Sequence, residues 1–277
     1  MLVYAGIDEA GYGPMFGPLV IARSVFVLPD HDPAASGGPP SMWSLMPSAI
    51  CKKTSDKKRR IAVNDSKQLY TPSAGLSHLE RGVLAFAALA GHEPTTVDQL
   101  LAHVAYDDES RQPDQLWYMT DDGGPALPTC VDAGLLKIAR SQLAGAAEKA
   151  KLELAHLNAA VLYEDRFNRM VAATRSKARC SWTFVGGHLL AIWNQFSQHR
   201  PRVVIDRQGG RTRYAEPLSL LFDGASIEVE CESPLLSEYL IEQDGRSMLV
   251  SFAVGSEQQH LPVALASMTA KYVREVL

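Results

Sequence analysis

The sequence has few cysteines and no histidine pattern typical of metal sites. Four cysteines lie among 277 residues without CxxC spacing, and the eight histidines form neither an HxxxH nor an HExxH pair. A disulfide framework and the common zinc motifs are therefore excluded. The chain has no run of about 18 apolar residues and no basic-then-apolar opening segment, so we expect neither a membrane span nor a secretory signal. The expected class is a reduced, cytoplasmic enzyme or binding protein.

An excess of positive charge is also absent. The 31 acidic and 27 basic residues give a net charge of −4. Overall charge therefore does not indicate a nucleic-acid partner, which would need a local basic patch. Residues 51–60 (CKKTSDKKRR) form one such stretch, with six basic residues in ten. Alone, this stretch is typical of a solvated loop; the alternative is a surface that contacts phosphates.

The composition, 46% hydrophobic and 21% charged, is that of a globular protein. The length suits one large domain, and we predict a single domain over residues 1–277. It carries an insertion around residues 106–150, whose part at 106–131 is acidic and rich in proline and glycine. This part resembles a long loop.

Apolar patterns predict a mixture of strands and helices. Buried strands are expected at 2–7 and 19–28, joined as a hairpin by a Gly-Pro turn. Further strands are expected at 202–206, 225–234 and 247–255, and helices at 76–91, 132–151, 181–196 and 261–277. Residues 152–163 are ambiguous and fit a strand. This mixture predicts an α/β or mixed α+β layered fold.

Acidic residues follow three of these predicted strands. Asp8 and Glu9 open a turn in AGIDEAGYGPMFGPLVIA, a stretch with four glycines and two prolines. Asp206 ends a second strand, and Glu257 lies between a third strand and the last helix. Sites form at strand ends in open α/β sheets, so these acids can converge. Carboxylates without Cys or His ligands favour Mg²⁺ or Mn²⁺, and two such ions can assist an in-line phosphoryl displacement.

The adjacent pair raises a geometric difficulty. Neighbouring strand residues point to opposite faces, so Asp8 and Glu9 can serve one site only if the strand ends or bulges there. Gly11 and Gly13 would permit a bulge. The alternative is that these acids lie in surface loops, which we would favour for any one of them taken alone. The acid pair abutting a buried strand is the strongest element, because burial without a partner is costly.

Four segments resemble, in family order, the motifs of the ribonuclease HII/HIII family of the ribonuclease H-like superfamily. They are GIDEAGYGPMFGPLVIA, VNDSKQL, VVIDRQGG and SEQQHLPVALASMTAK. The resemblance implies an α/β ribonuclease H-like fold, with a central mixed β-sheet, antiparallel in its first strands and flanked by helices. It also implies a metal-dependent endonuclease that hydrolyses the RNA strand of RNA–DNA hybrids with two Mg²⁺ or Mn²⁺ ions.

The resemblance also assigns residues. Position by position, the metal-binding and catalytic acids are Asp8, Glu9, Asp206 and Glu257. The glycine turn at Gly11, Tyr12 and Gly13 would sense the ribose 2′-hydroxyl, by which proteins distinguish RNA from DNA. The remaining substrate contacts would come from Ser66, Lys67, Ser267 and Lys271.

The sequence departs from the family pattern in several places. Glu257 and the block after it resemble type III members, whereas Tyr12 stands where the type II turn usually has arginine. The chain has neither the further C-terminal helices of type II members nor the extra N-terminal domain of many type III members. We therefore expect continuous hybrids to be cut better than duplexes with one ribonucleotide. The alternatives are a DNA nuclease or resolvase on the same fold and an inactive hybrid-binding module.

Overall fold

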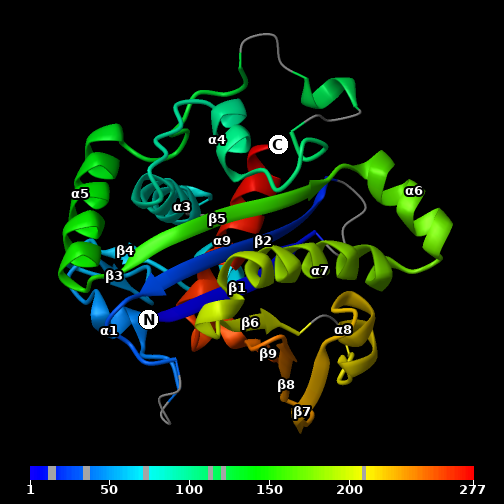
Figure 1. The fold of residues 1–277 in the computed structure, drawn as a ribbon. Helices are drawn as coiled ribbons and strands as arrows, with labels where there is room; N and C mark the ends of the chain where they lie inside the picture. Colours follow the sequence, from blue (N-terminus) through cyan, green and yellow to red (C-terminus); the bar gives the residue numbers. More distant parts are fainter. Residues whose placement is uncertain (12–16, 34–37, 71–74, 112–114, 120–122, 208–209) are drawn as a thin grey trace.

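A seven-stranded mixed β-sheet forms the centre of the molecule (Figure 1). The computed structural model describes residues 1–11, 17–33, 38–70, 75–111, 115–119, 123–207 and 210–277. The strands are β1 (Leu2–Ala10), β2 (Leu19–Leu28), β3 (Ile50–Cys51), β4 (Ile61–Ala62), β5 (Glu153–Leu162), β6 (Arg202–Asp206), β7 (Ser226–Glu232), β8 (Leu236–Gln243) and β9 (Arg246–Ala253). The helices are α1 (Met42–Leu45), α2 (Ser66–Leu69), α3 (Ser77–Leu89), α4 (Val97–Val104), α5 (Ala133–Lys149), α6 (Glu164–Thr174), α7 (Lys177–Phe196), α8 (Ala215–Leu221) and α9 (Leu261–Val276), with 3₁₀ turns η1 (Leu116–Tyr118), η2 (Ser197–His199) and η3 (Ser256–Gln258).

The strand order brings three strand ends to one edge of the sheet. The order is β5-β2-β1-β6-β9-β8-β7, with β3 and β4 forming a separate pair. β1 pairs in parallel with β6, and β6 with β9, whereas β2, β5, β8 and β7 pair with their neighbours antiparallel. The carboxyl ends of β1, β6 and β9 therefore point the same way. The segments that follow these three strands meet at one edge.

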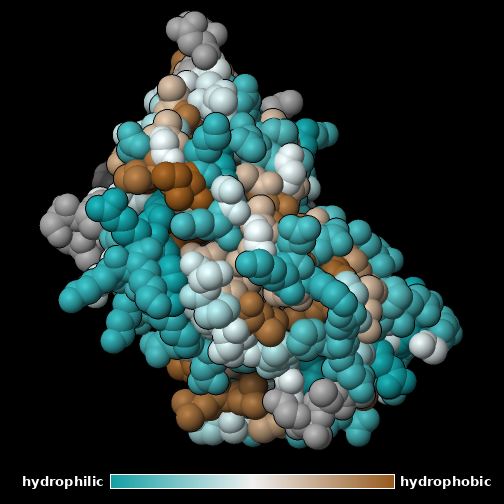
Figure 2. All heavy atoms as spheres, turned by 90° about the vertical axis from the view of Figure 1, so that its left-hand side faces the viewer, coloured by the Kyte–Doolittle hydropathy of each residue, from teal (hydrophilic) through white to brown (hydrophobic). Residues whose placement is uncertain are grey.

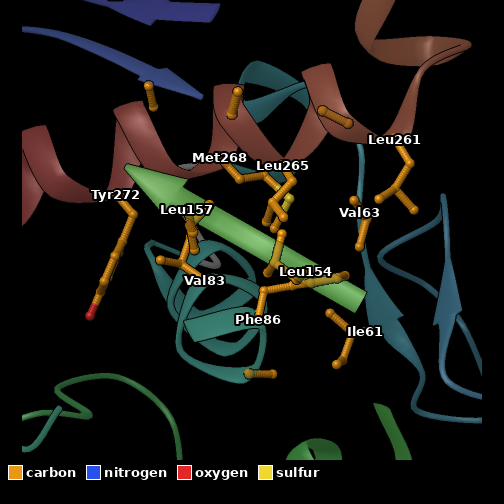
Figure 3. Close-up of a cluster of buried hydrophobic side chains, with 14 of the residues drawn as sticks. Ile61, Val63, Val83, Phe86, Leu154, Leu157, Leu261, Leu265, Met268 and Tyr272 are labelled. Carbon is orange, nitrogen blue, oxygen red and sulfur yellow. The ribbon is translucent and has the colours of Figure 1, made fainter. Parts of the chain in front are cut away.

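Helices cover both faces of the sheet because its central strands are apolar on both sides. Along β1, Leu2 and Tyr4 belong to the core under α9, whereas Val3 and Ile7 belong to the core under α7. In Figure 3, side chains of α9 meet those of α3 and β5 in the first of these cores. The protein is thus an α/β structure with its sheet between helical layers.

Gly6 sets the distance between β1 and α9. A Cβ atom at Gly6 would lie 2.2 Å from both the carbonyl carbon of Pro262 and the backbone nitrogen of Val263. The Ser24 hydroxyl also donates a 2.8 Å hydrogen bond to the Pro262 carbonyl, and the Tyr4 hydroxyl bonds His260. The first turn of α9 therefore rests directly on the backbone of β1.

The long predicted elements are confirmed. β1 and β2 form the expected hairpin, and the ambiguous segment at 152–163 contains strand β5. Two differences stand out. α7 begins at Lys177, not at 181, because the Ser176 hydroxyl caps it by accepting a hydrogen bond from the Arg179 N–H. Strand β8 and helices α4, α6 and α8 were not predicted from the sequence.

The region around 106–150, predicted to be an insertion, is tied to the core by packing and by hydrogen bonds. Its last part forms α5, whose Leu136 and Leu143 are fully or almost fully buried in the core shared with α3. Ahead of α5, the backbone N–H groups of residues 129–131 donate hydrogen bonds of 2.6–2.8 Å to the carboxylate of Glu80, which is 0% exposed. The Tyr272 hydroxyl donates a further bond of 3.0 Å. That the chain forms one domain stays a prediction.

The face at the left of Figure 1 carries α1, α5 and the β3–β4 pair, and Figure 2 shows that hydrophilic residues cover most of it. Among the residues described above, no helix is both long and apolar enough to cross a membrane.

Candidate functional site

Asp8, Asp206 and Glu257 come from the three parallel strand ends. Ile7 of β1 pairs with Ile205 of β6, so Asp8 and Asp206 each follow a paired residue on adjacent strands. Both isoleucines belong to the core under α7. Because side chains alternate along a strand, Asp8 and Asp206 project to the opposite face, the one covered by α9.

The turn after β9 places Glu257 beside them. Gly255 has a φ of +64°, a conformation that glycine adopts readily, and it turns the chain into η3. The backbone N–H and the hydroxyl of Ser256 lie 3.4 and 3.2 Å from Oδ1 of Asp206, and both donate to it. These bonds hold η3 against the end of β6. Glu257, the next residue, is only 7% exposed.

The three carboxylates form one electrostatic cluster. Burial raises the pKa of Asp8 well above its ordinary value, and the carboxylates of Asp206 and Glu257 raise it further. Burial is also the main cause that raises the pKa of Asp206 and that of Glu257, and Asp206 adds to the shift at Glu257. Each of these acids is thus destabilised in its charged form. A cation placed among them would relieve that destabilisation.

α2 and α9 supply polar groups to the same cluster. Ser66 of α2 and Ser267 of α9 share a 3.1 Å hydrogen bond between their hydroxyls. Ser267 also hydrogen-bonds to Asp8, which opposes the rise of that carboxyl's pKa. Lys67 is exposed, and its charge opposes the raised pKa of both Asp206 and Glu257. The structure therefore brings together Asp8, Asp206, Glu257 and three of the four substrate contacts predicted outside the glycine turn.

Lys271, the fourth predicted contact, lies one turn after Ser267 on α9. Its Nζ is 2.7 Å from Oε1 of Glu275 and 5.0 Å from the ring centre of Tyr70, the residue that ends α2. Lys271 is therefore on the α2 side of α9, where it is already engaged by a carboxylate and an aromatic ring.

Glu9 lies on the other face of the sheet. β1 pairs with β2 without a register shift as far as Ala10, so the alternation of side chains continues through Glu9. The Ser181 hydroxyl of α7 donates a 2.6 Å hydrogen bond to Oε2 of Glu9. The bulge that would bring Glu9 beside Asp8 is thus not present in β1. Among the described His, Cys, Asp and Glu residues, no group of three could hold a metal ion between them.

The described ends of the glycine turn are held by two residues that sequence reasoning missed. Gly11 has a φ of +97°, and a Cβ there would lie 2.5 Å from the Pro18 carbonyl oxygen and 2.9 Å from Nε of Arg274. The Gly17 N–H donates a 3.1 Å bond to Oε1 of Glu164 at the start of α6. Tyr12 and Gly13 lie outside the described residues. No local pattern marks Arg274 or Glu164, because both reach the turn from helices far away in the sequence.

The basic segment at 51–60 connects β3 to β4, and its residues Lys52 and Arg60 have different partners. Lys52 donates to the carbonyl of Gln258, the residue after Glu257, and its Nζ lies 4.4 Å from the centre of the Trp43 ring. Arg60 is bound to Asp56 and to the Pro47 carbonyl, so it stabilises the loop. Of these described contacts, the bond from Lys52 is the one that reaches the segment carrying a candidate acid.

The chain matches no protein-family model, and no curated protein matches its sequence. Its likeness to the ribonuclease HII/HIII family therefore depends on the four sequence motifs.

Proposed function

We propose that this chain is a metal-dependent endonuclease of the ribonuclease HII/HIII type, with a ribonuclease H-like fold, that hydrolyses the RNA strand of RNA–DNA hybrids. One observation carries the proposal: Asp8, Asp206 and Glu257 lie at neighbouring strand ends, beside Lys67 and Ser267. The four motifs and a mixed sheet whose first two strands are antiparallel support it.

The chemistry of this donor set fits Mg²⁺ or Mn²⁺, which prefer carboxylate oxygens. Since no three described acids are arranged to hold one ion between them, each ion would be held by one or two of Asp8, Asp206 and Glu257 together with water and substrate phosphate oxygens. The chemistry that such ions supply is to activate water for attack on a phosphate and to stabilise the leaving oxygen. For Glu9 the proposal depends on its motif alone, because its side chain bonds to Ser181 on the other face.

The other residues have roles that follow from their positions. Lys67 is exposed beside the acids, so its ammonium group can bind a substrate phosphate. Ser267 orients the Asp8 carboxylate and is itself bonded to Ser66. Lys271 lies one helical turn further along α9 and is paired with Glu275, so its role as a substrate contact depends on its motif alone. The glycine turn, which begins at Gly11, would contact the ribose.

The test is incubation of the purified protein with a labelled RNA–DNA hybrid or an all-DNA duplex, in Mg²⁺, Mn²⁺ or EDTA. We expect metal-dependent cutting of the RNA strand of the hybrid only. Asp206→Asn keeps the shape of the side chain and removes its charge, so it should abolish cleavage while hybrid binding persists. Asp223→Asn, at an exposed position after α8, is the matched control and should retain full activity.

Other outcomes would contradict the proposal. Cutting of the all-DNA duplex would indicate a DNA nuclease, and binding of the hybrid without cutting would indicate a binding module. Full activity of Asp206→Asn would remove this residue from the mechanism.

A further inference from the structure

A groove lies between α7 and α8, on the face of the sheet opposite α9. Its volume is about 660 Å³, and Arg179, Trp182, Arg211, Arg213 and Glu216 are among the residues that line it. The two helices, which lie next to each other in Figure 1, are in contact where Gly186 of α7 faces Leu221 of α8: a Cβ at Gly186 would lie 3.1 Å from Cδ1 of that leucine. The groove is thus part of the packed structure.

Positive charge predominates in this groove. Its described lining contains three arginines and one glutamate. All three arginines are exposed, and the Arg213 guanidinium lies 3.6 Å from the carboxylate of Glu232. The Arg211 guanidinium lies 5.7 Å from the ring centre of Tyr214. Planar guanidinium groups suit phosphate oxygens, so the charge and shape fit a polyanion.

Trp182 adds an aromatic surface to the lining of the groove. It is half-buried, and its ring packs 6.1 Å from Tyr214 and 6.2 Å from Phe252, centre to centre. Those two rings are stacked on each other at 3.6 Å. Basic side chains combined with a supported aromatic ring are typical of surfaces that bind nucleic acid.

Two chain segments connect the groove with the candidate site. Ser181, two residues after Arg179, bonds Glu9 at the end of β1. Arg211 and Arg213 lie on the chain that leaves β6 directly after Asp206. The acids at this edge of the sheet therefore lie between two basic surfaces, one formed by α2 and α9 with Lys67 and the other by this groove.

We infer that the α7–α8 groove binds the phosphate backbone of the hybrid duplex while the site at the strand ends engages the RNA strand. The inference rests on the proposed function. A duplex carries negative charge along two backbones, so a site flanked by two basic surfaces can contact both. Phosphate contacts position a duplex without reading its sequence, and the groove should therefore serve any sequence.

The test measures binding of a fluorescein-labelled RNA–DNA hybrid by anisotropy over a series of salt concentrations, in EDTA so that no cutting occurs. The variant is Arg179→Ala/Arg211→Ala, which removes two of the three arginines that line the groove. The control is Lys137→Ala/Lys149→Ala, which removes the same charge from exposed positions on α5, across the sheet. Denaturant unfolding of both variants checks that they are folded.

We expect the groove variant to bind about tenfold or more weakly near 0.1 M salt, with a salt dependence less steep by up to about 1.8, or about 0.9 for each phosphate that the variant no longer neutralises. The control should bind as the unsubstituted protein does. The same weakening is expected with an all-DNA duplex, because phosphates are common to both. If the folded groove variant shows an unchanged salt dependence of binding while the unsubstituted protein still cuts the hybrid, the inference is overturned and the proposed function stands. If the unsubstituted protein binds no nucleic acid, both the inference and the proposed function fail.

Discussion

Replacing Gly6 by alanine tests whether the close contact between β1 and α9 builds the candidate site. Gly6 faces α9 and precedes Asp8 by two positions, so both residues lie on the same face of β1. The added Cβ would lie 2.2 Å from two backbone atoms of α9, whereas ordinary contact begins at 3.4 Å. The strand and the helix must therefore separate by about 1.2 Å at this point.

The magnitude follows from that displacement. Overpacking of a core typically costs about 1–3 kcal/mol, and backbone atoms cannot rotate away, so we expect a loss of about 3 kcal/mol in the free energy of unfolding. For a chain of this size the melting temperature should fall by roughly 6–12 °C. Ser267 moves with α9, away from Asp8. A misplacement of about 1 Å in a catalytic group lowers the rate on the order of 100-fold, which is the expected loss of hybrid cleavage.

The assay is urea unfolding together with hybrid cleavage well below the melting temperature. The control is Gly145→Ala on α5, where a Cβ would meet nothing within 4 Å. The free energy of unfolding of the control should rise by about 0.5–1 kcal/mol, because alanine is the better helix residue, and its activity should be unchanged. If Gly6→Ala unfolds within about 0.5 kcal/mol of the unsubstituted protein, the reasoning from the 2.2 Å contact is refuted.

Three further changes test other parts of the structure. Glu80→Gln should lower the free energy of unfolding by about 3 kcal/mol or more, because an amide cannot accept from every donor around this buried carboxylate; a loss below about 1 kcal/mol in urea unfolding would contradict this. Lys57→Ala/Lys58→Ala should flatten the salt dependence of hybrid binding by up to about 1.8 if the segment contacts phosphates, and an unchanged slope would assign it to the solvated loop. In thermal unfolding, added Mg²⁺ should stabilise the unsubstituted protein but not Asp8→Asn. Without metal, Asp8→Asn should be more stable by about 1 kcal/mol because repulsion between the acids is removed, whereas Glu9→Gln, on the other face, should not.

The elements that could be predicted from the sequence are the strands and helices that bury long apolar stretches or wide apolar faces. β1, β2, β6 and β9 contain consecutive apolar residues, because helices cover both faces of the central strands. The long helices α3, α5 and α9 carry wide apolar faces. Such patterns can be recognised in the sequence without knowing which elements pack against them.

Of the missed elements, α6, α8 and β8 carry a weak or concealed signal. α4 carries a clear one, because Val97, Leu100, Leu101 and Val104 are buried at helical spacing after the Thr96 N-cap, and it could have been predicted. α6 has no fully buried residue, and its apolar face is short, with Phe167 and Met170 packed against the core but only partly buried. α8 is seven residues long and contains Pro217. β8 does alternate, with Ser237, Tyr239 and Ile241 buried, but a serine in the buried series and Leu236 and Leu240 on the other face conceal the pattern. A count of period-two matches would have found it.

The candidate site could likewise be predicted only in part. Acids that end apolar strands are visible in the sequence, and the parallel pairing of β1, β6 and β9 explains why three of them converge. Arg274 and Glu164 were not predicted because their positions beside Gly11 and Gly17 depend on how α9 and α6 pack. Contacts between segments far apart in sequence leave no local pattern.

The separation of Asp8 from Glu9 follows from the strand itself. β1 continues to Ala10 because β2 pairs with it to the end, and this regular pairing sends successive side chains to opposite faces. Asp8 therefore joins Asp206 and Glu257 under α9, while Glu9 meets Ser181 of α7 beside the basic groove. A substrate that spans the edge of the sheet would contact both faces, and Glu9 lies where they join. The pair of acids in the first motif thus marks the edge of the sheet that lies between the two proposed phosphate-binding surfaces.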